Sequence, residues 1–188
     1  MSPSVADAAR AMAAGALVVY PTDTLLGLGA KATDRPAVER LLAAKGRPSR
    51  QPLSVAVSSF EELEPLADLS PAGRRFVRAH LPGPFTILAR PSSWARRSLA
   101  PAVAGGRTVG LRVPDHPVAR ELARRVGPVI ATSANRHGSP PARTVADARA
   151  VFGGAVSVYL SGRPPPSGRP SELVDLTGRV PRRLPRRR

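Results

Sequence analysis

Two cations in the segment "KGRP" are the first residues whose types and spacing could do chemistry. Lys45 and Arg47 stand one residue apart in an irregular stretch rich in glycine and proline. A lysine supplies a compact charge and an arginine a planar fork, a combination that suits phosphate groups. Because lysine otherwise occurs only at Lys31, we expect the two cations not to be interchangeable. The alternative is an ordinary solvated loop.

A second candidate site closes the apolar run "VIATSAN". Ser133 and Asn135 flank the small Ala134, and residues two apart in extended chain face the same side. They would present a hydroxyl and an amide together, which are groups that fix a ligand rather than activate one. A Ser-His-Asp triad through His137 is disfavoured because the GxSxG turn is absent. The segment therefore predicts a strand end that holds a ligand.

Three other polar positions each allow two interpretations. The stretch "PTDT" follows a buried run and is either a hydroxyl-stabilised turn or part of a ligand site. Arg112 lies within the alternating "TVGLRV", where an arginine either snorkels to solvent or meets a carboxylate, including that of a substrate. His116 either begins a helix at the surface or takes part in catalysis. "GLGAKA" lacks the third glycine of a dinucleotide fingerprint, and no P-loop occurs.

The composition limits the class of protein. A chain of 188 residues fits one domain that can bury a sizeable core. The absence of cysteine excludes a disulfide framework and a thiol nucleophile, and three scattered histidines predict no metal site. No apolar run of about 18 residues and no signal peptide is present. We therefore expect a cytoplasmic protein without a membrane segment.

The charge is the outlying property, with 29 basic against 13 acidic residues and a net charge of +16. Such a field favours polyanions such as nucleic acid or nucleotide phosphates. Two interpretations stay open: a merely solvated arginine-rich surface, or a surface that faces RNA. Six arginines lie in residues 179–188, which we expect to form a tail without regular structure.

Predicted strands and helices alternate along the chain. Helices are expected over 5–14, 34–44, 59–67, 71–80, 116–126 and 144–152, and strands over 16–20, 53–57, 85–89, 108–113, 128–133, 155–160 and 171–178. Loops are expected at 21–29, at the irregular 45–52 and at the flexible 161–170. The alternation predicts an α/β domain with a mixed sheet, whose polar strand ends converge on one side.

Six blocks of the sequence resemble the YrdC/YciO-type domain family in order and spacing: "YPTDTLLGLGAKA", "LLAAKGRPSRQPLSV", "LPGPFTILA", "TVGLRVPDHP", "VIATSANRHG" and "RPSELVDLTG". The combination of KxR with SxN is specific to that family. The resemblance covers about residues 5–178. It implies one domain over 1–178, a twisted mixed sheet with flanking helices around a basic cavity, followed by the tail at 179–188.

The resemblance also implies an activity. Enzymes of this family are L-threonylcarbamoyladenylate synthases, nucleotidyltransferases that convert L-threonine, bicarbonate and ATP into threonylcarbamoyl-AMP and pyrophosphate. The product serves t6A modification of adenosine 37 in tRNA by downstream transferase proteins. Mg²⁺ would be bound through the ATP phosphates, and the chain is expected to be a monomer. The alternative is a non-catalytic member of the same fold that binds double-stranded RNA or tRNA, or associates with the ribosome.

Matching positions carry expected roles. The resemblance places ATP at Lys45, Arg47, Thr108, Asn135 and Arg143, with Lys45 and Arg47 as the catalytic pair. It places threonine at Thr22, Ser54, Arg112, Ser133 and Ser171. The chain departs from the usual pattern at Leu25 and Leu26, where many members have Val-Tyr, at His137 in place of a serine, and at Glu172 in place of a threonine.

Overall fold

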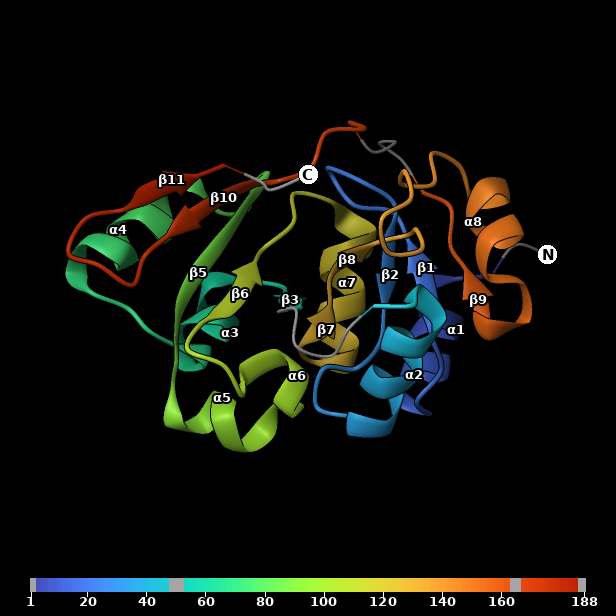
Figure 1. The fold of residues 1–188 in the computed structure, drawn as a ribbon, viewed down its shortest axis with the longest axis horizontal. Coiled ribbons are helices and arrows are strands. Elements are labelled where there is room, and N and C mark those ends of the chain that lie inside the picture. The colour runs from blue at the N-terminus through green and yellow to red at the C-terminus, as the bar shows by residue number, and fades with distance from the viewer. Residues whose placement is uncertain (1–2, 48–52, 163–166, 186–188) are drawn as a thin grey trace.

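The computed structural model describes residues 3–47, 53–162 and 167–185, and it arranges their strands in two sheets (Figure 1). The smaller sheet has the order β8-β2-β1-β9, and the larger has the order β11-β10-β5-β6-β3-β7 with β4 paired to β5. The strands are β1 (Val18–Tyr20), β2 (Gly27–Gly29), β3 (Ser54–Ala56), β4 (Ala67–Asp68), β5 (Phe85–Pro91), β6 (Val109–Arg112), β7 (Val129–Ile130), β8 (Thr132–Ser133), β9 (Val158–Tyr159), β10 (Glu172–Asp175) and β11 (Arg182–Leu184).

Helices pack around both sheets. They are α1 (Val5–Ala13), α2 (Arg35–Lys45), α3 (Phe60–Leu63), α4 (Pro71–His80), α5 (Ser93–Ser98), α6 (Pro101–Ala104), α7 (Pro117–Val126) and α8 (Val145–Phe152), with 3₁₀ turns η1 (Glu64–Leu66) and η2 (Gly153–Ala155). The pairs β1/β9, β3/β6 and β5/β10 are parallel, and the remaining strand pairs are antiparallel. The predicted α/β class with a mixed sheet is confirmed.

The helix α2 sets the position of the first candidate cation. Asp34 caps it by accepting a hydrogen bond from the Ala37 amide at 3.0 Å, and Gly46 ends it in the left-handed conformation at φ 60°. Val38 and Leu41 on this helix are fully buried. Lys45 was expected in the irregular segment 45–52, but it is the last residue of α2. It follows Val38 and Leu41 on the same face of the helix, so its side chain also points inward.

The segment that was predicted as one strand over 128–133 forms two short strands instead. The strand β7 pairs with β3 of the larger sheet, whereas β8 pairs with β2 of the smaller one. Between them the Ala131 amide donates to the Ser54 carbonyl at 2.7 Å. The chain therefore crosses from one sheet to the other at this point, and the polar end of β8 lies at the junction of the sheets.

The predicted loop at 21–29 contains the strand β2, which pairs with β1. Its glycines allow the close approach of an aromatic ring, since a Cβ added at Gly29 would lie 2.7 Å from Cε1 of Tyr20. The two glycines of "GLG" thus accommodate Tyr20. This role agrees with the absence of a dinucleotide or P-loop fingerprint.

The predicted unstructured tail is partly ordered, because residues 182–184 form β11 against β10. Arg182 and Arg183 make ion pairs with Asp175 and Glu172 at 3.3 and 3.2 Å, which offsets the repulsion expected of clustered arginines. The helices α5 and α6 were not predicted. The helix predicted over 59–67 is too long, because α3 ends at Leu63 and the chain continues as η1 and β4. Parts of three predicted segments lie outside the described residues. These parts are 48–52 of the irregular segment, 163–166 of the flexible loop at 161–170, and 186–188 of the tail.

Two hydrophobic clusters hold the structure together. The larger cluster fills the space between the sheets and helices such as α2, and the smaller one joins α1 and α7 to β1. Both are built largely from alanine, valine and leucine, which fits the low aromatic content of 4%. Among the described residues, no helix has the length and apolar character needed to cross a membrane.

Candidate active site

A cavity of about 820 Å³ opens where the two sheets meet. Strand ends and loops from both sheets supply its walls, as expected for polar residues that follow buried strands. Six residues that the sequence singled out line it together: Thr22, Arg47, Ser54, Arg112, Ser133 and Ser171. The fold therefore gathers positions that are up to 149 residues apart in the sequence around one space.

Lys45 lies beneath this cavity rather than among its lining residues, with only 2% of its surface exposed. Its Nζ donates to the carbonyl oxygens of Ser133 and Asn135 at 2.6 and 2.7 Å, and to Oδ1 of Asn135 at 3.3 Å. Burial, and then the charge of Arg47, lower the pKa of Lys45 to about 8. The ammonium thus binds the "TSAN" segment to the end of α2.

The side chains of Ser133 and Asn135 share a side, as their spacing predicts, and they contact each other. Ser133 Oγ donates to Asn135 Oδ1 at 2.6 Å. The Asn135 amide nitrogen donates to the carbonyls of Arg136 and Ser139 at 2.9 and 2.6 Å. Asn135 therefore organises the loop after β8, whereas Ser133 lines the cavity.

Arg47 completes the cationic side of the cavity. It follows Gly46 directly after α2 and lines the space together with Ser133 and His137. Burial lowers the pKa of Arg47, yet an arginine keeps its charge at neutral pH. The backbone amide of His137 donates to the Lys45 carbonyl at 2.7 Å, and this bond holds the loop after β8 against the end of α2.

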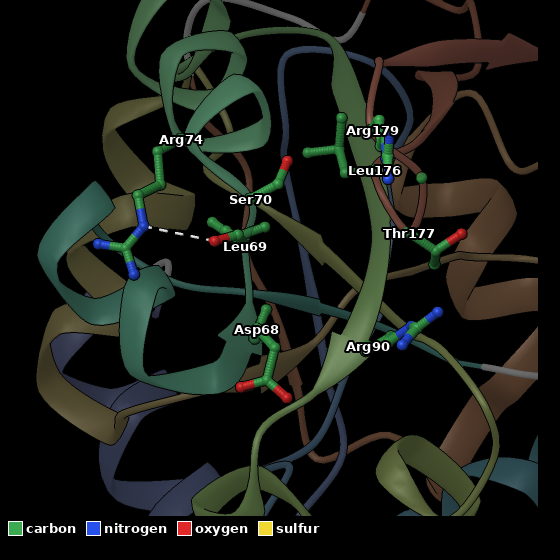
Figure 2. Close-up of a pocket in the computed structure, with 10 residues that line it drawn as sticks. Asp68, Leu69, Ser70, Arg74, Arg90, Leu176, Thr177 and Arg179 are labelled. Atoms are coloured by element: carbon green, nitrogen blue, oxygen red, sulfur yellow. Dashed lines mark hydrogen bonds between the residues drawn. The ribbon is translucent and has the colours of Figure 1, made fainter.

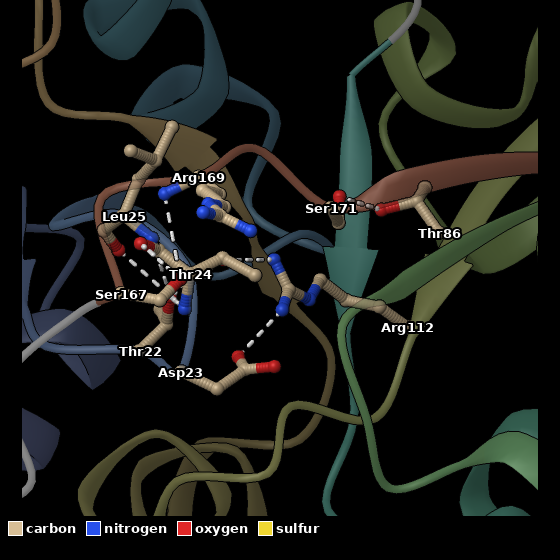
Figure 3. Close-up of polar contacts among 9 residues, drawn as sticks. All are labelled: Thr22, Asp23, Thr24, Leu25, Thr86, Arg112, Ser167, Arg169 and Ser171. Atoms are coloured by element: carbon tan, nitrogen blue, oxygen red, sulfur yellow. Dashed lines mark hydrogen bonds and ion pairs between the residues drawn. The ribbon is translucent and has the colours of Figure 1, made fainter.

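Arg112, at the end of β6, is only 6% exposed and meets a carboxylate of its own chain (Figure 3). Its Nη2 donates to Asp23 Oδ1 at 2.6 Å, and its Nη1 donates to Thr24 Oγ1 at 3.0 Å. Within the described residues, Nε of Arg112 and Oδ2 of Asp23 are buried and make no hydrogen bond. Burial raises the pKa of Asp23 while the guanidinium opposes that change.

The loop "PTDT" is both a turn and part of the cavity wall. Thr22 Oγ1 donates to the Leu25 carbonyl at 2.7 Å and accepts from the Thr24 amide at 3.2 Å, which is the predicted hydroxyl-stabilised turn. The amides of Ser167 and Gly168 donate to the carbonyls of Asp23 and Thr24 at 3.2 and 2.8 Å. This contact ties the segment that leads to Ser171 onto the loop.

Thr86 is a cavity residue that the sequence analysis did not single out. Its hydroxyl lies 2.7 Å from that of Ser171, and both side chains are buried (Figure 3). Thr86 and Leu88 alternate with buried Ile87 and Ala89 along β5, so strand parity directs both to the cavity side. That alternation was visible in "FTILA" and could have identified Thr86.

Three more predicted nucleotide ligands do not line the cavity. In the described part of the chain, Thr108, Asn135 and Arg143 are not among its lining residues. Arg143 is exposed just before α8, where its backbone amide donates to Asp147. Their roles toward ATP stay predictions. His116 begins α7, since its Nδ1 accepts from the Val118 amide at 3.2 Å. It is only 1% exposed, so the helix start is confirmed and the expected surface position is wrong.

Comparison with known proteins shows the family of this chain. The family model Sua5_yciO_yrdC, described as "Telomere recombination", matches residues 10–187. The chain belongs to this Sua5/YciO/YrdC family. The resemblance noted in the six sequence blocks is therefore confirmed, including the fold that it implied.

The similarity to individual relatives covers nearly all of this chain. A Mycobacterium tuberculosis protein is 42% identical over 184 residues, 97% of this chain and 83% of that protein. The threonylcarbamoyl-AMP synthase of Cellvibrio japonicus is 38% identical over 187 residues, 97% of this chain and 96% of that protein. The structure of P. abyssi Sua5 complexed with L-threonine matches with a TM-score of 0.87 and 34% identity, over 96% of this chain and 53% of that one. This chain thus spans about half the length of the Sua5 protein.

Proposed function

We propose that this chain is a threonylcarbamoyl-AMP synthase. The reaction joins L-threonine, bicarbonate and ATP to give threonylcarbamoyl-AMP, pyrophosphate and water. The observation that carries the proposal is the cavity of about 820 Å³, where the hydroxyls and guanidinium predicted for threonine meet the cation predicted for phosphate. The name of the Cellvibrio japonicus relative and the threonine complex of P. abyssi Sua5 support it.

The threonine end of the cavity is proposed around Arg112. A guanidinium has five N–H donors, and the structure shows two atoms of this one engaged by Asp23 and Thr24. The remaining donors suit the carboxylate of the amino acid. The hydroxyls of Thr22 and Ser171 and the side chain of Ser54 line the same cavity and would hold its polar groups. Asp23 keeps the guanidinium in place while it lies behind the lining residues.

The nucleotide end is proposed around Arg47 and Ser133. The guanidinium of Arg47 would hold the phosphates, and Lys45 would act by fixing the "TSAN" segment and by adding its charge from below. Asn135, Thr108 and Arg143 complete the proposed set of nucleotide ligands. Catalysis then consists of positioning and charge compensation, which lower the barrier by holding reactants in line.

No protein nucleophile is required in this scheme. The amine of threonine takes up the carbon of bicarbonate as a carbamate with loss of water. An oxygen of that carbamate attacks the α-phosphorus of ATP, and the bond to the β-phosphate oxygen breaks to release pyrophosphate. The class is a nucleotidyl transfer, and the labile product would pass to the proteins that modify tRNA.

Magnesium enters the proposal only with ATP. Within the described residues there is no group of three His, Cys, Asp or Glu side chains that could hold a metal, and Asp23 is already paired with Arg112. These residues do not form a protein cage for Mg²⁺, which often binds mainly through water and substrate phosphates. We therefore assign no step to a protein-held ion.

Pyrophosphate release tests the proposal. Purified protein is incubated with ATP, MgCl₂, bicarbonate and L-threonine, and each component is then left out in turn. Release is expected only in the complete mixture, with little or none when D-threonine replaces L-threonine. Release that does not depend on threonine would overturn the synthase assignment and favour the alternative of a non-catalytic member of the fold.

A further inference from the structure

The hydroxyls of Thr86 and Ser171 form a buried pair in the wall of the cavity, where β5 meets the start of β10 (Figure 3). Their oxygens lie 2.7 Å apart, and the two residues are only 2% and 4% exposed. Within the described residues, the Thr86 hydroxyl bonds to no group other than that of Ser171. A hydroxyl oxygen has two lone pairs, so the Thr86 oxygen keeps an acceptor position whichever hydroxyl donates. Because Thr86 lines the cavity, this position is available to a ligand.

The strand register places Thr86 next to Arg112, the proposed ligand of the threonine carboxylate. On the antiparallel strands β5 and β6, Ile87 pairs with Leu111, so the next position on each strand sets Thr86 opposite Arg112. On the other side of β6, the partner of Arg112 is Ala56, which has no polar side chain. The amine of an amino acid is bonded to the carbon beside its carboxylate. With the carboxylate at Arg112, the amine therefore lies within reach of the Thr86 hydroxyl.

The other hydroxyls near Arg112 are less suited to the amine. Thr24 Oγ1 already bonds to Arg112 Nη1 and to Thr22 Oγ1, each at 3.0 Å. Ser54 is one step further along the sheet, because it pairs with Gly110 rather than with Arg112. These contacts favour the pair of Thr86 and Ser171 as the place of the amine.

The lining of the cavity carries positive charge and no carboxylate. No aspartate or glutamate of the described residues lines it, and the stretches outside these residues contain neither type. Asp23 lies behind the lining and is paired with Arg112. Arg47 lines the same space, and the buried ammonium of Lys45 lies beneath it. An amino acid in water carries an ammonium group, and unbalanced positive charges nearby disfavour that charged form.

Other ionisable groups also surround this space. Those that line or underlie the cavity in the described residues are Tyr20, Asp23, Lys45, Arg47, Arg112 and His137. Burial raises the pKa of Tyr20 well above its usual range, so its phenol stays neutral. Glu172, next to Ser171, is exposed and paired with Arg183. A pH effect on binding therefore has to be separated from the titration of these groups.

We propose that Thr86, together with Ser171, binds the amine of L-threonine in its uncharged form and so prepares it to react. The lone pair of this amine forms the new bond to the carbon of bicarbonate. One hydrogen of the amine and one hydroxyl of bicarbonate leave as water, and the carbamate remains. The extra proton of the ammonium is released to solvent when threonine binds, so this step needs no general base on the protein. The inference rests on the proposed function, since it takes threonine as the ligand of the cavity.

Calorimetry of threonine binding tests the charge of the amine. L-Threonine is titrated into the full chain without ATP or bicarbonate, at several pH values and in two buffers that differ in enthalpy of ionisation. The pH values stay well below 8, where Lys45 keeps its proton. Binding should release about one proton and should tighten about tenfold for each unit of pH. Affinity that does not change with pH, without release of a proton, would overturn the proposal.

A ligand without the amine separates it from the ionisable groups of the protein. Dihydroxybutanoate with hydroxyls at the second and third carbons keeps the carboxylate and side chain of threonine but replaces its amine. Its affinity should change less than about twofold over the same pH range. Equal pH dependence of both ligands would place the titrating group on the protein and overturn the proposal. Threonine-dependent pyrophosphate release with pH-independent threonine binding would contradict this inference alone, whereas absence of threonine binding would contradict the proposed function as well.

Substitution of Thr86 tests the role of its hydroxyl. Thr86→Val keeps the shape of the side chain but removes the acceptor. Its KM for threonine should rise about tenfold, the effect of losing one buried hydrogen bond, while its KM for ATP changes less than twofold. Thr86→Ser retains a hydroxyl and should stay close to the parent protein in both constants. Circular dichroism checks that the fold is kept.

Thr177 provides the matched control. It lies in a separate hollow of about 580 Å³ between α4 and the turn after β10, which shares no lining residue with the cavity (Figure 2). Its hydroxyl donates to Asp175 Oδ1 at 2.7 Å, so Thr177→Val also loses a hydroxyl and a hydrogen bond. The KM for threonine should not change in this variant. Equal values of this KM in Thr86→Val and Thr177→Val would overturn the assignment of Thr86.

Discussion

The Nζ of Lys45 lies 2.6 Å from the carbonyl oxygen of Ser133, and this hydrogen bond joins two segments 88 residues apart. One segment ends α2 and the other ends β8 at the junction of the two sheets. The two polar motifs that stand out in the sequence are therefore one structural unit. A buried ammonium joins them by donating to oxygens of the second motif.

Replacing Lys45 by methionine tests this dependence. Methionine retains most of the side-chain volume, so the core around α2 stays filled, but the donors to Ser133 and Asn135 are lost. We expect the rate of threonine-dependent pyrophosphate release to fall by about 10² or more, the effect of losing one positioned charge group in an active site. Circular dichroism should show an intact fold.

The other lysine provides the matched control. Lys31 is half-buried, and its backbone forms a bridge to Val129 outside the cavity. Lys31→Met should retain nearly full activity. Comparable losses in both variants would show that the effect comes from lysine removal in general rather than from the contact of Lys45 with Ser133.

The lowered pKa of Lys45 predicts a pH dependence. Its ammonium is present below about 8 and is lost above that pH, whereas a lysine in the unfolded chain keeps its proton to 10.5. Between these values the unfolded state binds more protons, so the contribution of Lys45 to the free energy of unfolding rises with pH. Activity should move the other way and decline as pH rises through about 8, because the neutral amine has fewer donors.

Two lysines make this titration easy to follow. In protein labelled with ¹³C-lysine, one Cε signal should titrate near pH 8, and Lys45→Met should remove that signal. The pH profile of pyrophosphate release should share its midpoint. Two signals that both titrate at the ordinary lysine value of about 10.4 would contradict the prediction.

The buried pair of Asp23 and Arg112 predicts a loss of stability. Their side chains are only 11% and 8% exposed, so Asp23→Asn leaves a buried guanidinium without its counter-ion. We expect the free energy of unfolding in urea to drop by about 3 kcal/mol. The KM for threonine should also rise more than the KM for ATP, because the guanidinium loses its fixed orientation.

An exposed ion pair serves as the comparison. Glu121 on α7 bonds to Arg124 and Arg125 at the surface, and Glu121→Gln removes the carboxylate charge from those contacts without leaving a buried charge unpaired. Its urea midpoint should stay close to that of the parent protein. If Asp23→Asn behaves in the same way, the pair at the cavity is not structurally important.

Gly29 offers a test of how the smaller sheet is built. A Cβ at this position would lie 2.7 Å from the ring of Tyr20 and 3.0 Å from Val129. Gly29→Ala should therefore destabilise the protein by roughly 1 to 3 kcal/mol through overpacking. Gly154→Ala, where a Cβ meets nothing within 4 Å, should have a much smaller effect on thermal unfolding.

Local sequence signals predicted much of this fold. Asp34 and Gly46 mark the ends of α2 by side-chain capping and by a left-handed turn, which depend only on neighbouring residues. The division of residues 128–133 between two sheets was not predictable in this way, because it depends on the bond from Ala131 to Ser54. The strand β11 was missed for the same reason, since its partner β10 supplies the acidic side chains.

In the candidate site, too, local features were predictable from the sequence, but contacts between distant segments were not. The sequence indicated that Ser133 and Asn135 face one side, which follows from strand geometry and is seen in their hydrogen bond. It also left open whether Arg112 snorkels to solvent or meets a carboxylate, and only the folded chain identifies Asp23 as its partner. The inward direction of Lys45 was not predicted, because the sequence placed this residue in an irregular segment, whereas it is the buried last residue of α2.

Formation of the adenylate itself is the most direct test of the proposed activity. Protein is incubated with ATP, MgCl₂, L-threonine and ¹³C-bicarbonate, and the products are separated at once and analysed by mass spectrometry. We predict threonylcarbamoyl-AMP that carries one ¹³C in its carbamoyl carbon, in wild-type protein and in Lys31→Met, and a strongly reduced amount in Lys45→Met. A wild-type protein that forms no labelled adenylate under these conditions would contradict the account.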